Sequence, residues 1–350
     1  MSGEGRAWAE LLRLPALFTV PGDALAGAAA MGSRPTRGTL LAIGASTSLY
    51  AAGMALNDWA DRDEDARDRP HRPLPSGRIR PAHALAAAGA LTGTGLALAH
   101  RANRTTGAVA TALAATVWAY DLRLKSTTAG PAAMGAARGL DLLMGAAATA
   151  GAGARGAPAP VFAAAASPAK ARGALNPVRA VAASPAGASS PLTPALVAAA
   201  TLAVHTTAVT TVSRTEAQGG SSGAPLKALA TGGGIAAMLL TTRAGRPLRE
   251  RSEVSASSPS RSGRGRPTSP APITVAFPAA AYATTALRPL FHAALNPSPP
   301  LTQRAVGAGI RALVPLQAAL AARSGAPVTA LATLALAPLA RRFAKKVSVT

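Results

Sequence analysis

Five acidic residues fall within nine positions of this chain, in segment 57–65 (NDWADRDED), directly after a long apolar run. If that run continues into the segment as one helix, Asp58, Asp61 and Asp65 share a helical face, because they stand at positions i, i+3 and i+7. Three like charges on one face repel one another unless a cation lies among them. Mg2+ suits such a place, since it takes oxygen ligands and completes its shell with water and substrate phosphates.

The residues that follow supply positive charge. Segment 67–78 reads RDRPHRPLPSGR, so guanidinium groups and a rigid, proline-rich turn come within reach of the carboxylates. An isolated acidic pattern is more often a solvated loop. Carboxylates that hold a metal, followed by guanidinium groups that bind phosphate oxygens, instead favour a metal–diphosphate site.

Segment 57–79 resembles the first signature of the UbiA superfamily of membrane prenyltransferases, which reads N-D-x-x-D-x-x-x-D and then, after a basic stretch, R-P-[IL]-P-S-G. A second family element, Y-D-x-x-x-K, is matched by Tyr120, Asp121 and Lys125. Motif identity is confined to about residues 55–140, and the order of elements is similar over most of the chain. The matched positions of the first signature are Asn57, Asp58, Asp61, Asp65, Arg72, Pro73, Pro75, Ser76 and Gly77.

The resemblance implies transfer of a prenyl group from a prenyl diphosphate to a hydrophobic acceptor. Mg2+ held by Asp58, Asp61 and Asp65 would bind the diphosphate. Arg72 and Lys125 would neutralise the charge that develops on the leaving group. The expected catalytic residues are therefore Asp58, Asp61, Asp65 and Lys125. The expected substrate-binding residues are Asn57, Arg62, Arg72, Tyr120, Asp121, Arg138, Asp141 and Arg214.

The second acidic motif of the family, D-x-x-x-D after the sixth helix, is depleted here. Segment 213–220 reads SRTEAQGG and holds one carboxylate, Glu216. Glu216 is the expected ligand of a second Mg2+, because this ion often uses only one or two protein carboxylates. The depletion leaves an alternative open, in which a non-catalytic relative binds or moves a lipid or pigment precursor. His205 recurs with Glu216 at helical spacing, but a lone histidine in an apolar helix is more often a hydrogen-bonded structural residue.

Asp141 stands inside another apolar run, where an ionisable residue is costly and usually faces a cavity or a partner. Arg138 lies three positions earlier on the same helical face, so a structural ion pair and a substrate contact are both open. Gly135, Gly139 and Gly145 would permit close helix packing at this run.

The elements that must position these residues are apolar. Hydrophobic residues make up 49% of the 350 residues, and ten runs nearly free of charge approach the roughly 20 residues that a spanning helix needs. We expect a single all-α domain over residues 1–350, an integral membrane bundle of nine or ten helices around a central cavity. The runs are 14–32, 38–56, 82–100, 105–120, 131–152, 193–213, 225–242, 272–292, 303–322 and 326–340.

Two segments of low complexity, 153–192 and 244–271, are predicted to be flexible loops, because they cannot bury enough apolar surface to become ordered. The second is rich in Arg, Gly and Ser, but it lacks the interleaved aromatic residues of a nucleic-acid-binding segment.

The net charge of +22 is concentrated between the apolar runs, as in loops that flank a bilayer, which argues against nucleic acid as the partner. The positive-inside rule places the motif loop 57–81 in the cytoplasm of a multi-pass plasma-membrane protein. Strict alternation of the helices would put the arginines of 243–271 outside, so the rule does not settle the whole topology.

The chain has no cysteine, which excludes disulfides, thiolate catalysis and thiolate metal sites. Arg6 and Arg13 precede an apolar stretch that superficially resembles a cleavable signal peptide. Further apolar runs follow at once, so we expect a retained anchor instead.

Overall fold

The computed structural model describes residues 3–150, 192–215, 221–241 and 272–347, and every regular element in these ranges is helical. The elements are α1 (Gly3–Leu11), η1 (Leu14–Thr19), α2 (Pro21–Ala30), α3 (Arg37–Ala60), α4 (Arg62–Asp68), α5 (Pro81–Ala102), α6 (Arg104–Ala119), η2 (Tyr120–Leu124), α7 (Gly130–Ala150), α9 (Thr193–Ser213), α10 (Gly223–Leu240), α11 (Pro272–Leu295), α12 (Pro299–Arg323) and α13 (Pro327–Val347). The expected loop 244–271, Glu216 and all of 153–192 except Leu192 lie outside the described residues.

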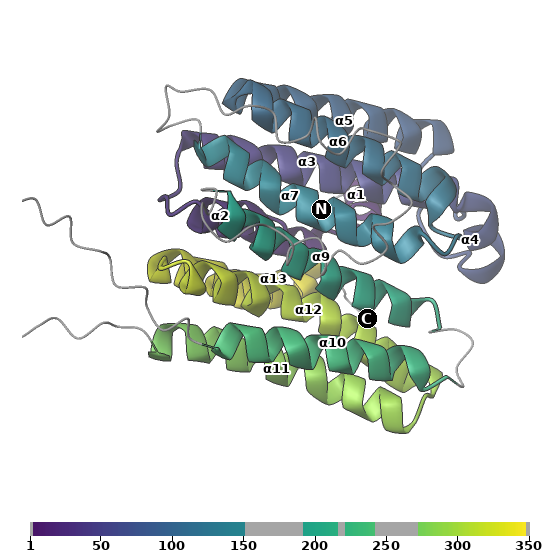
Figure 1. Cartoon of the computed structure of the whole chain (residues 1–350). Coiled ribbons are helices and arrows are strands. Elements are labelled where there is room, and N and C mark those ends of the chain that lie inside the picture. The colour runs from purple at the N-terminus through teal and green to yellow at the C-terminus, as the bar shows by residue number, and fades with distance from the viewer. Residues whose placement is uncertain (1–2, 151–191, 216–220, 242–271, 348–350) are drawn as a thin grey trace, which may run out of the picture.

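The long helices lie roughly side by side, as Figure 1 shows, with α3, α5, α6 and α7 in one half of the bundle and α10, α11 and α12 in the other. α7 and α9 join the two halves. α7 packs against α3, α6 and α9, and α9 also packs against α10 and α12. The largest buried cluster brings together side chains of both halves, among them Leu142 of α7, Leu202 of α9 and Tyr282 of α11.

Within the described residues, each of the ten apolar runs coincides with a helical part of the structure, the first run being divided between η1 and α2. The all-α prediction is therefore confirmed for the described residues. The count of nine or ten spanning helices is not confirmed, since five described helices are both long and apolar enough to cross a membrane. These five are Arg37–Ala60, Pro81–Ala102, Thr193–Ser213, Gly223–Leu240 and Pro299–Arg323.

Small residues let α7 approach its neighbours closely, as the glycines of this run predicted. A Cβ atom placed on Gly145 would lie 2.4 Å from the Cα atom of Ala24 in α2. One placed on Gly135 would lie 2.5 Å from the carbonyl oxygen of Ala203 in α9. Both contacts are shorter than real Cβ contacts, so each position requires glycine to keep the present helix spacing.

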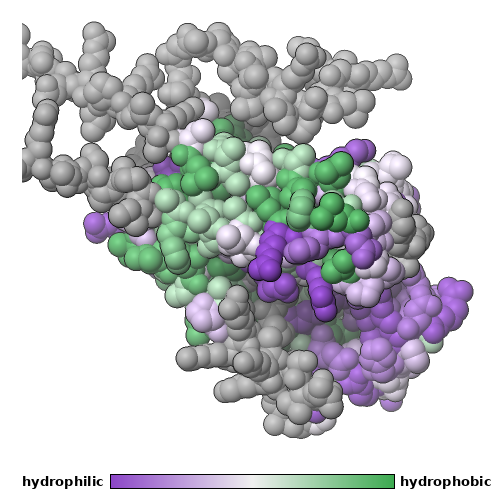
Figure 2. Space-filling model, turned by 90° about the horizontal axis from the view of Figure 1, so that it is seen from below, coloured by the Kyte–Doolittle hydropathy of each residue, from purple (hydrophilic) through white to green (hydrophobic). Residues whose placement is uncertain are grey.

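The surface is hydrophobic along much of the bundle. Figure 2 shows hydrophilic residues concentrated towards the end at which Figure 1 places α4, with hydrophobic residues over much of the remaining visible face. On this face, the hydrophilic residues are therefore most concentrated at the end of the bundle where α4 lies.

The condition on which the shared helical face depended, one helix through the whole acidic segment, is not met. α3 ends at Ala60, Asp61 forms a turn with φ −92° and ψ 3°, and α4 begins at Arg62. Acidic residues stabilise the start of a helix through its macrodipole, and the first turn of α4 holds Asp63, Glu64 and Asp65. The same carboxylates that suggest a metal site therefore also favour a new helix at this point.

Candidate functional site

Asp58 lies in the last turn of α3 and is 5% exposed. Its Oδ1 atom accepts a hydrogen bond from Nη2 of Arg13 at 3.0 Å, and Nη1 of Arg72 lies 3.7 Å from the same oxygen. A buried carboxylate with two guanidinium groups beside it is charge-compensated, and here both groups face the Oδ1 atom.

Asp65 of α4 is also buried, and its Oδ2 atom accepts a hydrogen bond of 2.7 Å from Nη1 of Arg72. The same Nη1 atom faces Asp58, so one cationic position is shared between two carboxylates. The break at Asp61 thus still allows the structure to bring Asp58 and Asp65 to a common point.

Arg72 is positioned by the proline-rich turn that follows α4. Its carbonyl oxygen accepts hydrogen bonds from the Ser76 hydroxyl at 2.6 Å and from the Ser76 amide at 3.0 Å. Gly77 has φ 74°, which glycine adopts without strain, and Leu74 is buried in a cluster that includes Leu56 of α3. The residues of the P-x-P-S-G pattern therefore hold the arginine against the end of α3.

Asp61 faces a different cation, because its Oδ1 atom forms an ion pair with Nζ of Lys125. Lys125 directly follows η2, a single π-helical turn, and such turns often occur at functional sites. The first acidic motif and the Y-D-x-x-x-K element therefore meet in space. We call the group Arg13, Asn57, Asp58, Asp61, Asp65, Arg72, Asp121 and Lys125 the mouth cluster.

Asn57 and Asp121 lie at the inner side of this cluster. The Asn57 amide donates to Oδ1 of Asp121 at 3.2 Å and accepts a hydrogen bond from Arg13 at 3.3 Å. Burial raises the pKa of Asp121 to about 7, although the hydrogen bond from Asn57 and the charge of Lys125 act in the opposite direction. Asp121 therefore changes its charge near neutral pH.

Two residues of the acidic segment lie away from the mouth cluster. The Asp63 side chain is 85% exposed, as the helical-face argument predicted, and Arg62 pairs with it at 3.6 Å. The Arg62 guanidinium also stacks over the ring of Trp59, 4.9 Å from the centroid. In this arrangement Arg62 contacts neither the three motif carboxylates nor the cavity, so its predicted substrate contact has no support in the geometry.

A Mg2+ ion fits this donor set. In the described parts of the chain, no three acidic or histidine side chains converge on one point as a complete metal cage. Mg2+ does not need one, since it commonly binds one or two carboxylates together with water and substrate phosphates. Asp58 and Asp65 meet this requirement, because both carboxylates face one position. The guanidinium of Arg72 lies at that position in this structure, so the position is suited to a cation.

Sequence reasoning mentioned Arg13 only as a charge before the first apolar run and missed its place in the mouth cluster. Arg13 has φ 48° and ψ 49°, the only left-handed residue other than glycine in the described chain, and this backbone turn separates α1 from η1. One property of the sequence could have identified Arg13 as a site residue. It is a single cation directly before an apolar run, in a chain whose motif carboxylates need positively charged partners.

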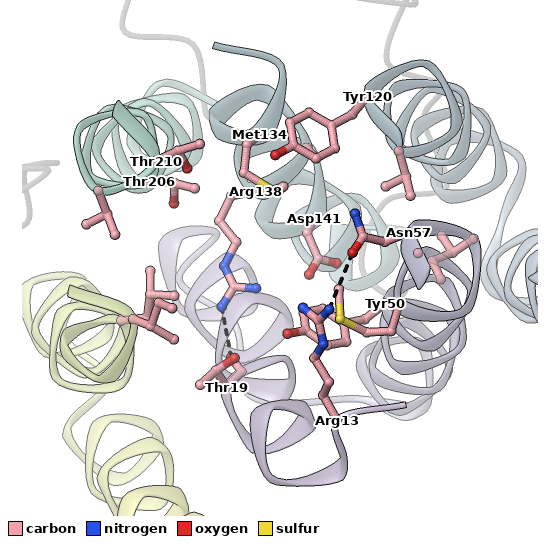
Figure 3. Close-up of a pocket in the computed structure, with 18 of the residues that line it drawn as sticks. Arg13, Thr19, Tyr50, Asn57, Tyr120, Met134, Arg138, Asp141, Thr206 and Thr210 are labelled. Carbon is pink, nitrogen blue, oxygen red and sulfur yellow. Dashed lines mark hydrogen bonds between the residues drawn. The ribbon is translucent and has the colours of Figure 1, made fainter. Parts of the chain in front are cut away.

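A cavity of about 450 Å³ extends inward from the mouth cluster. One face of α3 supplies a wall of it, and Figure 3 shows Arg13, Asn57 and Tyr120 on the same cavity as Arg138 and Asp141. Most of the lining is apolar, with contributions from Leu49, Met54 and other residues of α3, α6, α7, α9 and α12. The cavity can therefore hold an apolar chain whose charged end remains at the mouth cluster.

The inner end of this cavity is polar. Nε of Arg138 lies 3.0 Å from Oδ2 of Asp23, which is completely buried in α2. Asp141 instead accepts a hydrogen bond of 2.7 Å from the Ser46 hydroxyl, so the ion pair of Arg138 is with Asp23 rather than with Asp141. Asp23 was missed by the sequence analysis, although the rule that singled out Asp141 applies equally to a carboxylate in the first apolar run.

His205 is hydrogen-bonded through both ring nitrogens, as expected for a structural histidine in an apolar helix. Its Nδ1 atom lies 3.1 Å from the hydroxyl of Tyr282, and its Nε2 atom lies 3.0 Å from the carbonyl oxygen of Gly309. Arg214, after α9, is hydrogen-bonded to the carbonyl oxygens of Ser126 and Thr127. Its guanidinium therefore lies against the loop that follows Lys125, where it adds positive charge near the mouth cluster.

Comparisons with known proteins show the family of the chain. The sequence pattern of the UbiA prenyltransferase family matches residues 16–241. The digeranylgeranylglyceryl phosphate synthase of Methanopyrus kandleri is 36% identical over 127 residues, which cover 35% of this chain and 45% of that protein. The 33 kDa chain of bacteriochlorophyll synthase from Rhodobacter capsulatus is 43% identical over 100 residues, covering 27% and 33%. The chain thus matches less than half the length of these two curated relatives.

The fold has relatives among solved structures. The apo structure of a UbiA homologue from Aeropyrum pernix K1 matches 92% of this chain and 97% of its own, with a TM-score of 0.56 and 15% identity. A structure described for digeranylgeranylglyceryl phosphate synthase matches 92% and 98%, with a TM-score of 0.53 and 15% identity. At these identities the likeness supports the fold alone. Since the family pattern covers more than half of the 350 residues, the chain belongs to the UbiA prenyltransferase family.

Proposed function

We propose that the protein is a membrane enzyme that transfers a prenyl group from a prenyl diphosphate to a hydrophobic acceptor. The observation that carries this proposal is the Arg72 guanidinium shared between Asp58 and Asp65 at the entrance of a largely apolar cavity. A site with carboxylates for a metal, cations for phosphate and an adjoining apolar space matches both ends of a prenyl diphosphate. Family membership and relatives named as synthases support the same activity.

The charges of the mouth cluster suit this substrate. Asp58, Asp61 and Asp65 are paired with Arg13, Arg72 and Lys125, so a divalent cation and a diphosphate can enter together without leaving a large unpaired charge. When bound, Mg2+ would draw negative charge from the diphosphate oxygens and make the diphosphate a better leaving group. The arginines and the lysine then donate to phosphate oxygens instead of to carboxylates.

The chain's own cations act on the step in which the donor ionises. The bond between the prenyl C1 atom and the diphosphate oxygen breaks, and both electrons go to the diphosphate. The acceptor forms a new bond to C1 and loses a proton, which the released diphosphate can accept. Arg13, Arg72 and Lys125 stabilise the charge that develops on the leaving group, in a site where burial strengthens electrostatic interactions. The apolar cavity wall keeps water away from C1, which favours transfer over hydrolysis.

We propose a multi-pass location in the cell membrane with the motif loop 57–81 in the cytoplasm. Five described helices have the length and composition of membrane spans, and α7, α11 and other helices of the bundle would complete the nine or ten. The basic residues of the loop favour the cytoplasmic side. The prenyl donor, a charged molecule with an apolar tail, would enter the mouth cluster from that side.

The number of Mg2+ ions is a separate question, because Glu216 is the only carboxylate in segment 213–220. If Glu216 holds a second ion, Glu216→Gln should lower kcat by about 10²–10³-fold with little change in the KM for the donor. A kcat within a few-fold of wild type would leave one ion at Asp58, Asp61 and Asp65.

The activity is tested by expressing the full chain and supplying isotopically labelled prenyl diphosphates of several lengths with a lipid extract as the source of acceptors. Mass spectrometry should detect labelled products that require Mg2+, that disappear in Asp58→Asn and that persist in Asp63→Asn. Absence of product from every donor, together with weak donor binding that is independent of Mg2+, would support the alternative of a non-catalytic lipid-binding protein. The depleted second motif is the observation that favours this alternative.

A further inference from the structure

Hydrogen-bonded polar groups from five elements close the inner end of the cavity. Nε2 of Gln317, in α12, donates to Oδ1 of Asp23 in α2 at 2.7 Å and to the carbonyl oxygen of Thr19 in η1 at 2.9 Å. Asp141 of α7 accepts from Ser46 of α3 and shares a further hydrogen bond with Asp23. We call Thr19, Asp23, Ser46, Arg138, Asp141 and Gln317 the inner network.

The inner network leaves no passage for an apolar chain. Figure 3 shows the Arg138 side chain reaching the carbonyl oxygen of Thr19, and its Nε atom lies 3.0 Å from Oδ2 of Asp23. A chain that separated these groups would leave buried polar atoms and a buried charge without partners, which is costly. Beside the network, Ala110 and Met144 pack together in one cluster and have no exposed surface. The cavity therefore ends at this level.

An apolar wall leads from the mouth cluster to the inner network. Gly53 precedes Asn57 by one helical turn, and Val117 precedes Asp121 by the same number of residues. The two wall residues meet, because a Cβ atom on Gly53 would lie 3.0 Å from Cγ1 of Val117. The wall therefore begins directly inside the mouth cluster, where the first carbons of a prenyl chain would lie. The residues of this apolar wall are Leu49 and Gly53 of α3, Leu113 and Val117 of α6, and Ala137 of α7.

The distance between the two polar groups measures how much chain fits. Ser46 of the inner network and Asn57 of the mouth cluster stand eleven residues apart on α3. At 1.5 Å per residue they are about 16 Å apart along the helix. An extended chain advances about 1.2 Å per covalent bond, so the four main-chain bonds of an isoprene unit cover about 5 Å. The space between mouth cluster and inner network therefore takes about three isoprene units.

We propose that the closed inner end limits the prenyl donor to about three isoprene units, which lie along the apolar wall. A fourth unit has to displace hydrogen-bonded groups of the inner network or leave the cavity between helices. Leu113 lies one turn inside Val117, so its side chain contacts the third unit and takes part in setting the limit. This inference rests on the proposed transferase function, because it specifies the donor of the same site.

Four unreactive donors test the limit. They are the S-thiolodiphosphates of dimethylallyl, geranyl, farnesyl and geranylgeranyl alcohol, in which sulfur replaces the bridging oxygen. Dissociation constants are measured with the purified full chain in detergent and Mg2+, and each is corrected for partition of the compound into detergent without protein. We expect affinity to rise at least about tenfold with each unit up to farnesyl, as more apolar surface is buried. Geranylgeranyl should bind about tenfold more weakly than farnesyl, because its last unit overfills the cavity.

Two variants reduce the space for the third unit. In Leu113→Phe the dissociation constant of the farnesyl compound should rise about tenfold more than that of the dimethylallyl compound. Ala137→Leu should act in the same way from α7, and it keeps the test decisive if Leu113→Phe does not fold. Leu40→Phe is the control, because Leu40 is on α3 but 66% exposed, and it should leave the preference of wild type unchanged. Partition into detergent is the same for every variant and cancels from these ratios.

The outcomes separate the limit from the proposed function. If wild type binds the geranylgeranyl compound at least as tightly as the farnesyl compound, the limit is overturned and the chain leaves the cavity between helices. Equal effects of Leu113→Phe and Ala137→Leu on all four compounds would also overturn it. In both cases the proposed function stands, because the diphosphates bind. Absence of Mg2+-dependent binding for all four compounds would contradict the proposed function, and the limit with it.

Discussion

Nη2 of Arg13 lies 3.0 Å from Oδ1 of Asp58, a residue 45 positions later in the chain. The contact joins the segment before the first apolar run to the last turn of α3. The left-handed backbone of Arg13, with φ 48°, is uncommon for a residue with a Cβ atom, and it places the guanidinium over the entrance of the cavity. The amino-terminal segment is therefore part of the mouth cluster as well as part of the bundle.

Replacing Arg13 tests its proposed contact with the donor. Arg13→Met removes the charge and retains an unbranched side chain, so the KM for the prenyl diphosphate should rise about 10–100-fold, as expected for loss of a charge-assisted hydrogen bond. Arg34→Met, in the exposed turn between α2 and α3, is the matched control and should leave the KM unchanged. If the KM of Arg13→Met for the prenyl diphosphate equals that of wild type, this arginine only neutralises Asp58 and does not bind the donor.

The buried carboxyl of Asp121 makes stability depend on pH. Its pKa is raised from 3.8 to about 7, mainly by burial, so the folded chain keeps a proton that the unfolded chain loses between about pH 4 and pH 7. Stability from this group is therefore greatest below pH 4 and falls as the pH rises towards 7. The thermal midpoint of Asp121→Asn in detergent should fall less than that of wild type across this range. Parallel profiles for the two proteins would contradict the assignment.

The close contact between α7 and α2 should be intolerant of even one methyl group. Gly145→Ala would place its Cβ atom 2.4 Å from Cα of Ala24, and the helices must separate, at a cost of about 1–3 kcal/mol. Gly89→Ala is the control, because no atom lies within 4 Å of the added methyl, and it should stabilise α5 by up to about 1 kcal/mol. Thermal unfolding in detergent measures both changes, and equal midpoints for the two variants would refute the packing argument.

The helices could be predicted because long apolar runs separated by charged or glycine- and proline-rich segments permit little else. Most of their ends were recovered to within a few residues, as for the run 193–213, which coincides with α9. α13 is an exception, because it continues to Val347, beyond the predicted end at 340. The break at Asp61 could not be foreseen from the same pattern, since an acidic first turn is compatible both with the continuation of α3 and with the start of α4. Hydropathy alone also cannot decide how many alanine-rich helices span a bilayer.

The site was predicted in part. The motif pointed to Asp58, Asp65 and Arg72, and the structure brings these three together. The pairings of Arg13 with Asp58 and of Asp23 with Arg138 were missed, because the paired residues lie 45 and 115 positions apart and no spacing in the sequence links them. Such partners become visible only when the fold places a buried charge beside them.

We propose that Asp58, Asp61 and Asp65 belong to a Mg2+–diphosphate site and that Asp63 does not. The most direct measurement is the Mg2+-dependent release of inorganic diphosphate from a labelled prenyl diphosphate, in the presence of an acceptor extract, by wild type, Asp58→Asn, Asp61→Asn and Asp63→Asn. We expect a loss of at least about 10²-fold in the first two variants, with normal membrane insertion. Asp63→Asn, whose side chain is 85% exposed, should show near-wild-type release. Equal rates in all three variants would contradict it.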